Sequence, residues 1–446
     1  MGFIVMKNFI TNHMKKVWTL LIVVLIQCYA YSQVGLGIAT IDGLNDLQMV
    51  FEPGLKVGSL TVSKTFQPSF VVTEKGTLLV FCQGRLFDGE DNEPKVILMN
   101  KSYDFGKTWE GVEVISSPMN FFAISPYTAT IGGEEKISFL TCVGLKVTKE
   151  FYKDNFSELK EATGIDIEDI GKDKASVLVR YSSLDDGESW TMEYLNGDNT
   201  PLFKEYNGYV PIFMNTIGQV HQIPMGPNKG RMIIAAPIYS VPSGEEVTSN
   251  FRDYKCSGSG IIYSDDFGET WKMDGMITDY LANEASAVSI KGGKEILMIR
   301  RINNLQNYKE YNTVEMMNLG RNQRIANLSS DGGKSWSGPF LIDISEIECH
   351  GTLTRRNNRL YFSIPRGLQD INQQKKEWDD DRIRGAVFYS DDEGDTWKSK
   401  IIEPSYFSYS TLGKLNDTSM ITFFSRGGHG RLGIGYRVFS DEWLEN

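Results

Sequence analysis

The chain has 446 residues and a formal net charge of −11 at pH 7, from 57 acidic and 46 basic side chains. A protein this acidic is not expected to bind nucleic acid, because contact with the phosphate backbone requires a clustered positive surface. Cys82, Cys142, Cys256 and Cys349 are widely spaced and match no metal-ligand pattern. The sequence therefore predicts neither a metal site nor an organic cofactor.

The N-terminal segment is typical of a secretory signal peptide. Two lysines precede an apolar run over residues 17–26, and Ala30-Tyr31-Ser32 places small residues at −3 and −1 of a cleavage before Gln33. The run is too short for a stable transmembrane helix, and no later segment is apolar enough to span a bilayer. We expect residues 1–32 to be removed and the protein to be exported to the periplasm or beyond, with Cys28 a weaker candidate for a lipid anchor.

An eight-residue pattern, Ser-x-Asp-x-Gly-x-Ser/Thr-Trp, occurs five times at intervals of roughly 60 to 80 residues, which indicates one repeated supersecondary unit. The copies begin at Ser102, Ser183, Ser264, Ser329 and Ser390. Asp and Gly suit a tight hairpin turn, and the Trp supplies an apolar anchor at the start of the next strand. We expect these Asp residues to stabilise turns rather than to bind a ligand or metal.

These octets are the Asp boxes of the sialidase (neuraminidase) superfamily, which the chain resembles from about Phe51 to its end. The resemblance implies one all-β domain over residues 33–446, a six-bladed β-propeller with a box on each of five blades, and a monomer. Residues 155–172 are predicted to form a helical insertion in the second blade. Polar insertions at 242–257, 303–322 and 367–381 are expected to be loops that shape the site.

The first blade carries the first candidate site residues. The stretch from Phe66 to Arg85 resembles a family pattern of Arg-Ile-Pro, an apolar strand, Lys-Gly-Thr-Leu-Leu and Gly-Arg, except that Phe66 replaces the first Arg. In the family that Arg is one of three that hold the substrate carboxylate. We assign Arg85 to substrate binding and Asp91 to the general acid/base, with Asp88 as the second choice. A solvated acidic loop would also explain these acids.

The fourth blade resembles the family's Asn-Glu strand, turn, and strand ending in Arg. Asn283-Glu284 begins the first strand, Gly292-Gly293 forms the turn, and Arg300 ends the second strand. The resemblance implies that Glu284 is the base that activates a Tyr and that Arg300 holds the carboxylate. A surface ion pair at a hairpin mouth is the structural alternative.

The last two blades supply the remaining candidates. Arg382 precedes the fifth box by eight residues and matches the third carboxylate-binding Arg, with Arg384 as the alternative. Tyr409, in a Tyr-Ser-x-Leu match, would be the nucleophile. A neutral Tyr suits a substrate whose anomeric carbon bears a carboxylate, since an anionic nucleophile would be repelled. His350 is expected to be structural or to contact the substrate.

A second departure from the family accompanies Phe66. Ser425 stands where the family has a Glu that supports the first Arg. The two losses are physically linked, because a buried Glu without its Arg would be an unpaired charge. The pair therefore indicates a reshaped pocket, in which Arg426 or Lys64 could supply a substitute cation.

The sequence favours a retaining exo-glycosidase of the sialidase type that acts on sialoglycoconjugates through Tyr409, Glu284 and Asp91, with Arg85, Arg300 and Arg382 binding the substrate. A propeller glycosidase for another acidic sugar is the first alternative, because the first Arg is missing. A non-catalytic glycan-binding propeller is the second.

Overall fold

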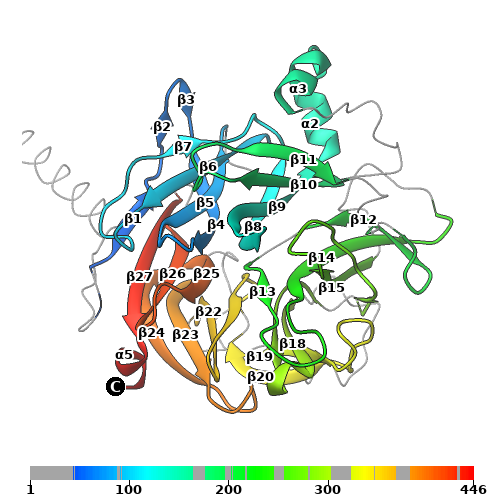
Figure 1. Cartoon of the computed structure of the whole chain (residues 1–446), viewed down its shortest axis with the longest axis vertical. Coiled ribbons are helices and arrows are strands. Elements are labelled where there is room, and N and C mark those ends of the chain that lie inside the picture. Colours follow the sequence, from blue (N-terminus) through cyan, green and yellow to red (C-terminus); the bar gives the residue numbers. More distant parts are fainter. Residues whose placement is uncertain are drawn as a thin grey trace, which may run out of the picture. The chain divides into compact units, whose positions relative to one another are not determined.

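Six antiparallel sheets are arranged around a central axis in the part of the chain that the structure describes (Figure 1). The structure is a computed structural model. It describes residues 44, 46–87, 91, 93–163, 176–195, 202, 204–215, 218–245, 256–279, 282–302, 323–345, 347–367, 382–428 and 432–446. The first strand of one blade contacts the first strand of a neighbour at several points round the ring, so these strands lie nearest the axis. This is the predicted six-bladed propeller.

Blades 1 to 3 follow one another along the chain. Blade 1 contains β4 (Lys64–Val72), β5 (Leu78–Arg85), β6 (Lys95–Ser102) and β7 (Glu113–Val114). Blade 2 contains β8 (Phe121–Ile131), β9 (Glu134–Gly144), β10 (Ser176–Ser183) and β11 (Thr191–Leu195). Blade 3 contains β12 (Tyr209–Met214), β13 (His221–Gln222), β14 (Met232–Pro242), β15 (Cys256–Ser264) and β16 (Met276–Ile277).

Blades 4 to 6 complete the ring. Blade 4 contains β17 (Ala282–Ile290), β18 (Glu295–Ile302), β19 (Gln323–Ser329) and β20 (Phe340–Ser345), with the 3₁₀ turn Lys291–Gly293 between its first two strands. Blade 5 contains β21 (Thr352–Arg356), β22 (Arg359–Pro365), β23 (Ile383–Ser390) and β24 (Lys398–Tyr406). Blade 6 contains β25 (Ser408–Lys414), β26 (Ser419–Arg426), β27 (Gly433–Ser440) and, as its outer strand, β1 (Gln48–Phe51).

Blade 6 is closed by the first strand of the described residues, since β1 pairs with β27 antiparallel. A short hairpin of β2 (Lys56–Val57) and β3 (Leu60–Thr61) leads from β1 to blade 1. The helix α5 (Asp441–Glu445) follows β27, with Ser440 accepting a hydrogen bond from the Trp443 backbone N–H at its N-terminus.

The five boxes are turns between the third and fourth strands of blades 1 to 5, as predicted. In each box the Asp carboxylate accepts hydrogen bonds from the backbone N–H and the hydroxyl of the Ser or Thr four residues later. The first Ser of each box accepts from the Gly backbone N–H. The carboxylates are thus used by the turns, as expected.

Each box also packs on the preceding blade. In the third box, Trp271 is fully buried against Tyr127 of blade 2, whose hydroxyl donates to the Gly268 carbonyl. The box glycines lie close to side chains of the preceding blade in all five cases: Gly106 to Tyr436, Gly187 to Leu79, Gly268 to Tyr127, Gly333 to Ile261 and Gly394 to Leu297. In blade 6, α5 takes this place, since Asp441 accepts from Tyr361 and pairs with Arg356 of blade 5.

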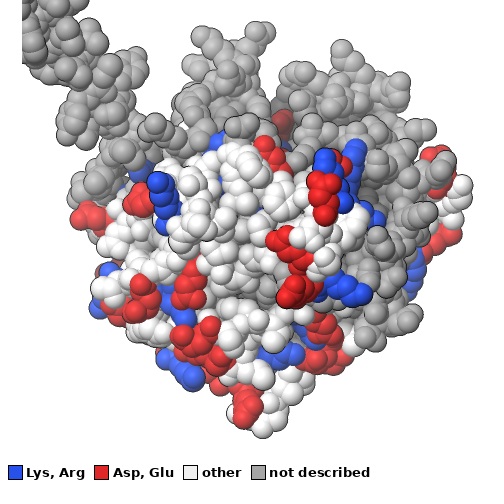
Figure 2. Space-filling model, turned by 90° about the horizontal axis from the view of Figure 1, so that it is seen from above, with Lys and Arg blue, Asp and Glu red and all other residues white. Residues whose placement is uncertain are grey.

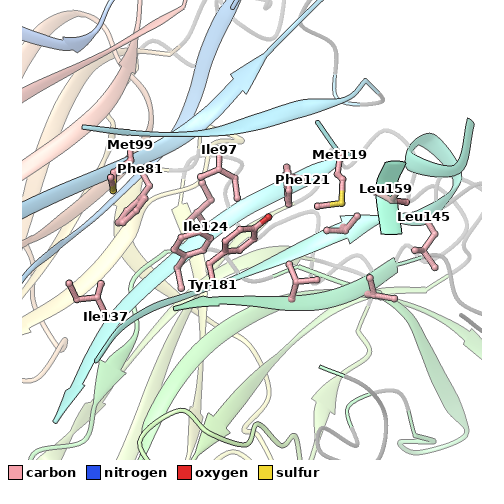
Figure 3. Close-up of a cluster of buried hydrophobic side chains, with 14 of the residues drawn as sticks. Phe81, Ile97, Met99, Met119, Phe121, Ile124, Ile137, Leu145, Leu159 and Tyr181 are labelled. Carbon is pink, nitrogen blue, oxygen red and sulfur yellow. The ribbon is translucent and has the colours of Figure 1, made fainter. Parts of the chain in front are cut away.

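The apolar cores lie between neighbouring blades. Figure 3 shows one of them, in which Phe81, Ile97 and Met99 of blade 1 face Phe121 and Tyr181 of blade 2. The cluster extends outward to Leu145 and Leu159 of the helical insertion. A blade is thus stable only with its neighbours, because burial of these side chains is the main favourable contribution to folding.

The insertion in blade 2 is helical, as predicted, although it begins ten residues earlier. It comprises α2 (Leu145–Phe151) and α3 (Phe156–Thr163), between β9 and β10. Its remainder lies outside the described residues. So do the predicted signal peptide with Cys28, the insertion at 303–322 and most of those at 242–257 and 367–381.

Charged side chains are interspersed on the side of the molecule seen in Figure 2, where Lys and Arg lie among Asp and Glu. Within the described ranges, no helix is long and apolar enough to cross a membrane.

The site and the boxes occupy opposite ends of the blades. In blade 1, Ser102 of the box pairs with Leu78, whereas Arg85 at the other end of β5 pairs with Lys64 and Lys95. At the Arg85 end, the innermost strands β4, β8, β17 and β25 each contain a β-bulge near their start. Bulges redirect side chains and are frequent beside active sites.

Replacing a box glycine should loosen the contact between two blades. A Cβ on Gly268 would collide with the Tyr127 ring, whereas one on Gly230 would meet nothing within 4 Å, and both residues have positive φ (+86 and +90). We expect Gly230→Ala to cost about 1–2 kcal/mol for the left-handed backbone. Gly268→Ala should cost about 1–3 kcal/mol more, through overpacking. Equal shifts of the two urea midpoints would contradict this role of the boxes.

Candidate active site

The centre of the site is a contact between blades 4 and 6. The Tyr409 hydroxyl donates to one oxygen of Glu284 at 2.7 Å, as the sequence predicted. Arg301 donates from the same nitrogen to the other Glu284 oxygen at 2.6 Å and to the Tyr409 hydroxyl at 3.1 Å. The three side chains therefore form a closed hydrogen-bonded cluster.

The backbone of Tyr409 is held in an unusual conformation. It lies in the bulge between Ser408 and Ser410 of β25, with φ +28. Its N–H, which is not paired with β26 at the bulge, donates to the sulfur of Cys349 at 3.1 Å. Strained backbone of this kind persists where surrounding structure fixes it, and it is frequent at functional sites.

Burial and charge set the protonation states of the cluster. Burial would raise the pKa of Glu284, but the charge of Arg301 and the hydrogen bonds from Arg301 and Tyr409 outweigh it, so the pKa is lowered. The pKa of Tyr409 is raised, by burial first and then by the negative charge of Glu284. At neutral pH the arrangement is therefore a neutral phenol that donates to a carboxylate, which is the ground state of a nucleophile beside its base.

The prediction that Arg300 reaches this cluster is wrong by one residue. The Arg300 side chain is buried and forms a bidentate ion pair with Asp279 at 2.7 Å, with further bonds to Asn327 and the Ala282 carbonyl. Successive side chains of a strand point to opposite faces, so Arg300 faces away from Glu284 and Arg301 faces it.

The register of the hairpin formed by β17 and β18 identifies the arginine that faces Glu284. Ala285 pairs with Arg300 and Val288 with Leu297, so counting outward from Gly292-Gly293 places Arg301 opposite Glu284. A count of the hairpin from its turn would have selected Arg301.

Arg382 lies beside the cluster, as predicted. Its guanidinium carbon is 5.3 Å from the centre of the Tyr409 ring, and the group donates to the Ser408 hydroxyl and the Glu348 carbonyl. Arg384, the alternative, is only partly buried and lies in an irregularity of β23. Arg301 and Arg382 thus place two cations near the Tyr409 hydroxyl and ring.

Phe66 packs on Tyr409, with ring centres 4.6 Å apart. The Arg85 guanidinium lies over the Phe66 ring, 4.4 Å from its centre, and donates to the Asp91 carboxylate at 2.7 Å. Asp91 is 63% exposed at its side chain. The structure therefore connects the first-blade candidates in a row from Tyr409 through Phe66 and Arg85 to Asp91; Asp88 lies outside the described residues.

The other residues of the predicted reshaped pocket surround this row. Ser425 is fully buried and pairs with Ser408 across β25 and β26, and no hydrogen-bond partner of its hydroxyl is present in the described ranges. Arg426 is buried at the end of β26, and Lys64 starts β4 opposite Arg85.

His350 is a further buried group at the site. Its ring centre is 6.3 Å from that of Tyr409, and its Nε2 has no hydrogen-bond partner among the described residues. Burial lowers the pKa of His350 to about 4, so the ring is neutral near pH 7. It lines a small cavity of about 10 Å³ together with Gln67, Ala123 and Tyr409. The described residues contain no group of His, Cys, Asp and Glu side chains that could hold a metal ion.

Comparisons with known proteins agree with this architecture. The family model for the BNR/Asp-box repeat matches residues 262–273, in the third box. A sialidase of Micromonospora viridifaciens is 26% identical over 385 residues, covering 84% of this chain and 51% of that protein. A sialidase of Paraclostridium sordellii is 24% identical over 272 residues, covering 60% of this chain and 56% of that one. The chain thus spans about half the length of these curated relatives.

Solved structures show the same fold. A Hadza microbial sialidase has a TM-score of 0.60 at 15% identity, over 86% of this chain and 66% of that one. The Trypanosoma rangeli sialidase also has a TM-score of 0.60 at 15% identity, over 90% of this chain and 60% of that one.

Arg300 should be essential for stability. Arg300→Met would leave the Asp279 carboxylate without its bidentate partner, which typically costs about 3–5 kcal/mol. Lys414→Met removes the exposed pair with Asp417 and should cost at most about 1 kcal/mol. Urea unfolding of the two variants measures the difference, and similar losses would refute a structural role for Arg300.

Proposed function

Because the chain is a BNR-repeat propeller of the sialidase type, we propose that it is a retaining exo-glycosidase that hydrolyses terminal sialic acid from glycoconjugates. The observation that carries the proposal is the hydrogen bond of 2.7 Å from the Tyr409 hydroxyl to Glu284, with Arg301 bonded to both. We propose further that residues 1–32 export the protein to its glycoconjugate substrates.

In the first step, the Tyr409 oxygen bonds to the anomeric carbon as the glycosidic C–O bond breaks. The phenol proton passes to Glu284, which already accepts it in a hydrogen bond. The leaving oxygen takes a proton from Asp91. A buried Tyr with a raised pKa is a weak nucleophile by itself, so the adjacent carboxylate is needed to activate it.

In the second step, water attacks the same carbon and gives its proton to Asp91, while Glu284 returns a proton to Tyr409 as the Tyr409–sugar bond breaks. Asp91 accepts from Arg85 in the structure, so this ion pair has to open before the carboxyl can carry a proton to the leaving group.

Arg301 and Arg382 are suited to hold the substrate carboxylate. Both guanidinium groups lie near Tyr409 and are largely buried. Charge-assisted bonds to a carboxylate are strong and directional in such surroundings. This places the acid group beside the carbon that Tyr409 attacks, and Arg301 replaces Arg300 in the proposed mechanism.

Phe66 favours a second candidate, a glycosidase for another acidic sugar. Its ring packs on Tyr409 at the position where the family has its first Arg, and Ser425 replaces the supporting Glu. An apolar ring there would suit a sugar whose acid group is bound by only two cations. It would also suit a sugar that presents a less polar face to Phe66.

The first test is turnover and covalent trapping. We expect wild type to release sialic acid from an α-sialoside, and 2,3-difluorosialic acid to give a covalent adduct on Tyr409 that peptide mass spectrometry locates. Tyr409→Phe should retain the melting temperature and lose on the order of 10⁴-fold in kcat.

The same assay distinguishes the alternatives. Cleavage of a uronic-acid glycoside, or of a ketosugar glycoside other than a sialoside, supports the second candidate when the sialoside is not cleaved. Binding of sialosides without cleavage of any acidic glycoside would leave a glycan-binding propeller, and an adduct on another residue would refute Tyr409 as the nucleophile.

Removing Arg301 should change the pH profile. Glu284 must be ionised to accept the proton, and Arg301 lowers the pKa of its carboxyl, so the acid limb of kcat/KM should lie below the ordinary carboxyl range. Arg301→Met should raise that pKa, so activity is lost at a higher pH as the solution is acidified. It should also lower kcat/KM by roughly 10- to 100-fold, the equivalent of one charge-assisted bond.

Arg355→Met is the matched control for this profile, because Arg355 pairs with Glu393 at the box end of blade 5. Its acid limb should coincide with that of wild type. An unmoved limb in Arg301→Met would mean that Glu284 is not the base.

A further inference from the structure

A buried lysine supports the loop that carries Asp91. The loop connects β5 to β6, and the residues at its two ends, Arg85 and Lys95, are a cross-strand pair. Arg85 binds the Asp91 carboxylate. The other end of the loop is held by Lys95.

The Lys95 ammonium group makes three short hydrogen bonds. Its Nζ donates to the carbonyl of Asp91 at 2.6 Å, to the carbonyl of Glu93 at 3.0 Å and to the side-chain oxygen of Asn120 at 2.6 Å. An ammonium has three protons, so every donor is used. Two of the bonds hold the main-chain carbonyls of Asp91 and Glu93. The third bond, to Asn120, links the loop to the segment that leads into blade 2.

This arrangement is costly by itself. Lys95 is 1% exposed, and no ion pair of its Nζ with a carboxylate lies within the described part of the chain. Burial, followed by the positive charge of Arg85, lowers the pKa of Lys95 to about 7, against the opposing effects of Asp91 and Glu93. Burying a charge without a paired carboxylate is unfavourable, and the one aromatic contact of the ammonium is distant, with Nζ 5.4 Å from the centre of the Phe122 ring. The free-energy cost of burying the Lys95 ammonium indicates that its contacts with the Asp91 and Glu93 carbonyls have a function.

We propose that Lys95 is a positioning residue that holds the backbone of Asp91, so that its carboxyl stays beside the leaving-group oxygen when the ion pair with Arg85 opens. The inference rests on the proposed function, in which Asp91 is the general acid/base. Arg85 and Lys95 then have separate roles. Arg85 binds the Asp91 carboxylate and must release it during the reaction. Lys95 binds the main chain of the loop and keeps these bonds throughout.

The test compares two substrates that differ in their need for an acid. A methyl α-sialoside has a poor leaving group and requires a proton, whereas a 4-nitrophenyl α-sialoside expels a stable phenolate. Lys95→Met, which keeps the length and apolar stem, should lower kcat/KM at least tenfold for the methyl glycoside and less than about threefold for the aryl glycoside, in keeping with the usual size of acid catalysis.

Three further variants complete the experiment. Asp91→Asn defines the leaving-group selectivity expected from loss of the acid. Lys101→Met is the matched control, because Lys101 is equally buried at the box end of the same strand and binds Glu188; any loss should be equal for both substrates. Asn120→Ala keeps the ammonium and removes one of its acceptors, so it should show the same selectivity as Lys95→Met at smaller amplitude. This variant provides the test if Lys95→Met does not fold.

The outcomes separate the two claims. If Asp91→Asn is selective but Lys95→Met and Asn120→Ala reduce both substrates equally, Lys95 is merely structural and the inference fails alone. If Asp91→Asn shows no selectivity, or wild type cleaves neither glycoside, the assignment of the acid fails and the inference fails with it. Selectivity in Lys95→Met that matches the selectivity of Asp91→Asn in direction supports the proposal.

Discussion

No blade of this protein can bury its own faces, and most of the structure follows from that constraint. A four-stranded sheet has two sides, and here each is covered by the sheet before or after it in the ring. The Asp boxes serve the same end, because each places a Trp and a Gly against the preceding blade. The sixth blade lacks a box, and α5 fills the corresponding position with ion pairs to Arg356 and Arg359.

The functional groups lie where the innermost strands leave this regular packing. Bulges in β4, β17 and β25 contain or flank Phe66, Glu284 and Tyr409. Three non-glycine residues with positive φ, Gln67, Glu348 and Tyr409, lie at or next to the site. Four more such residues lie in the boxes, at Phe105, Asp186, Phe267 and Glu393, where hydrogen bonds to the Asp carboxylates hold the turns. The boxes and the candidate site thus lie at opposite ends of the same blades.

The fold could be predicted from the sequence because the box pattern encodes a local turn, and the same turn recurs in five blades. The contact of Glu284 with Tyr409 could be predicted because each residue lies in a short motif. The choice of Arg301 over Arg300 depended on strand register, since adjacent side chains face opposite sides. The thiol of Cys349 on the Tyr409 backbone and the buried ammonium of Lys95 were missed, because they are tertiary contacts that no local pattern contains.

The pairing of β1 with β27 joins the two ends of the described chain across nearly four hundred residues. Contacts of such sequence separation form late, because the entropy of closing a long loop is lost before the contact is gained. Strand β1 therefore has no partner until β27, the last strand of the described chain, has been synthesised. Until then blade 6 has a bare edge, and unpaired edges favour pairing with other chains. Pairing with β1 thus closes the ring and covers the edge of β27, which would otherwise be open to pairing with another chain.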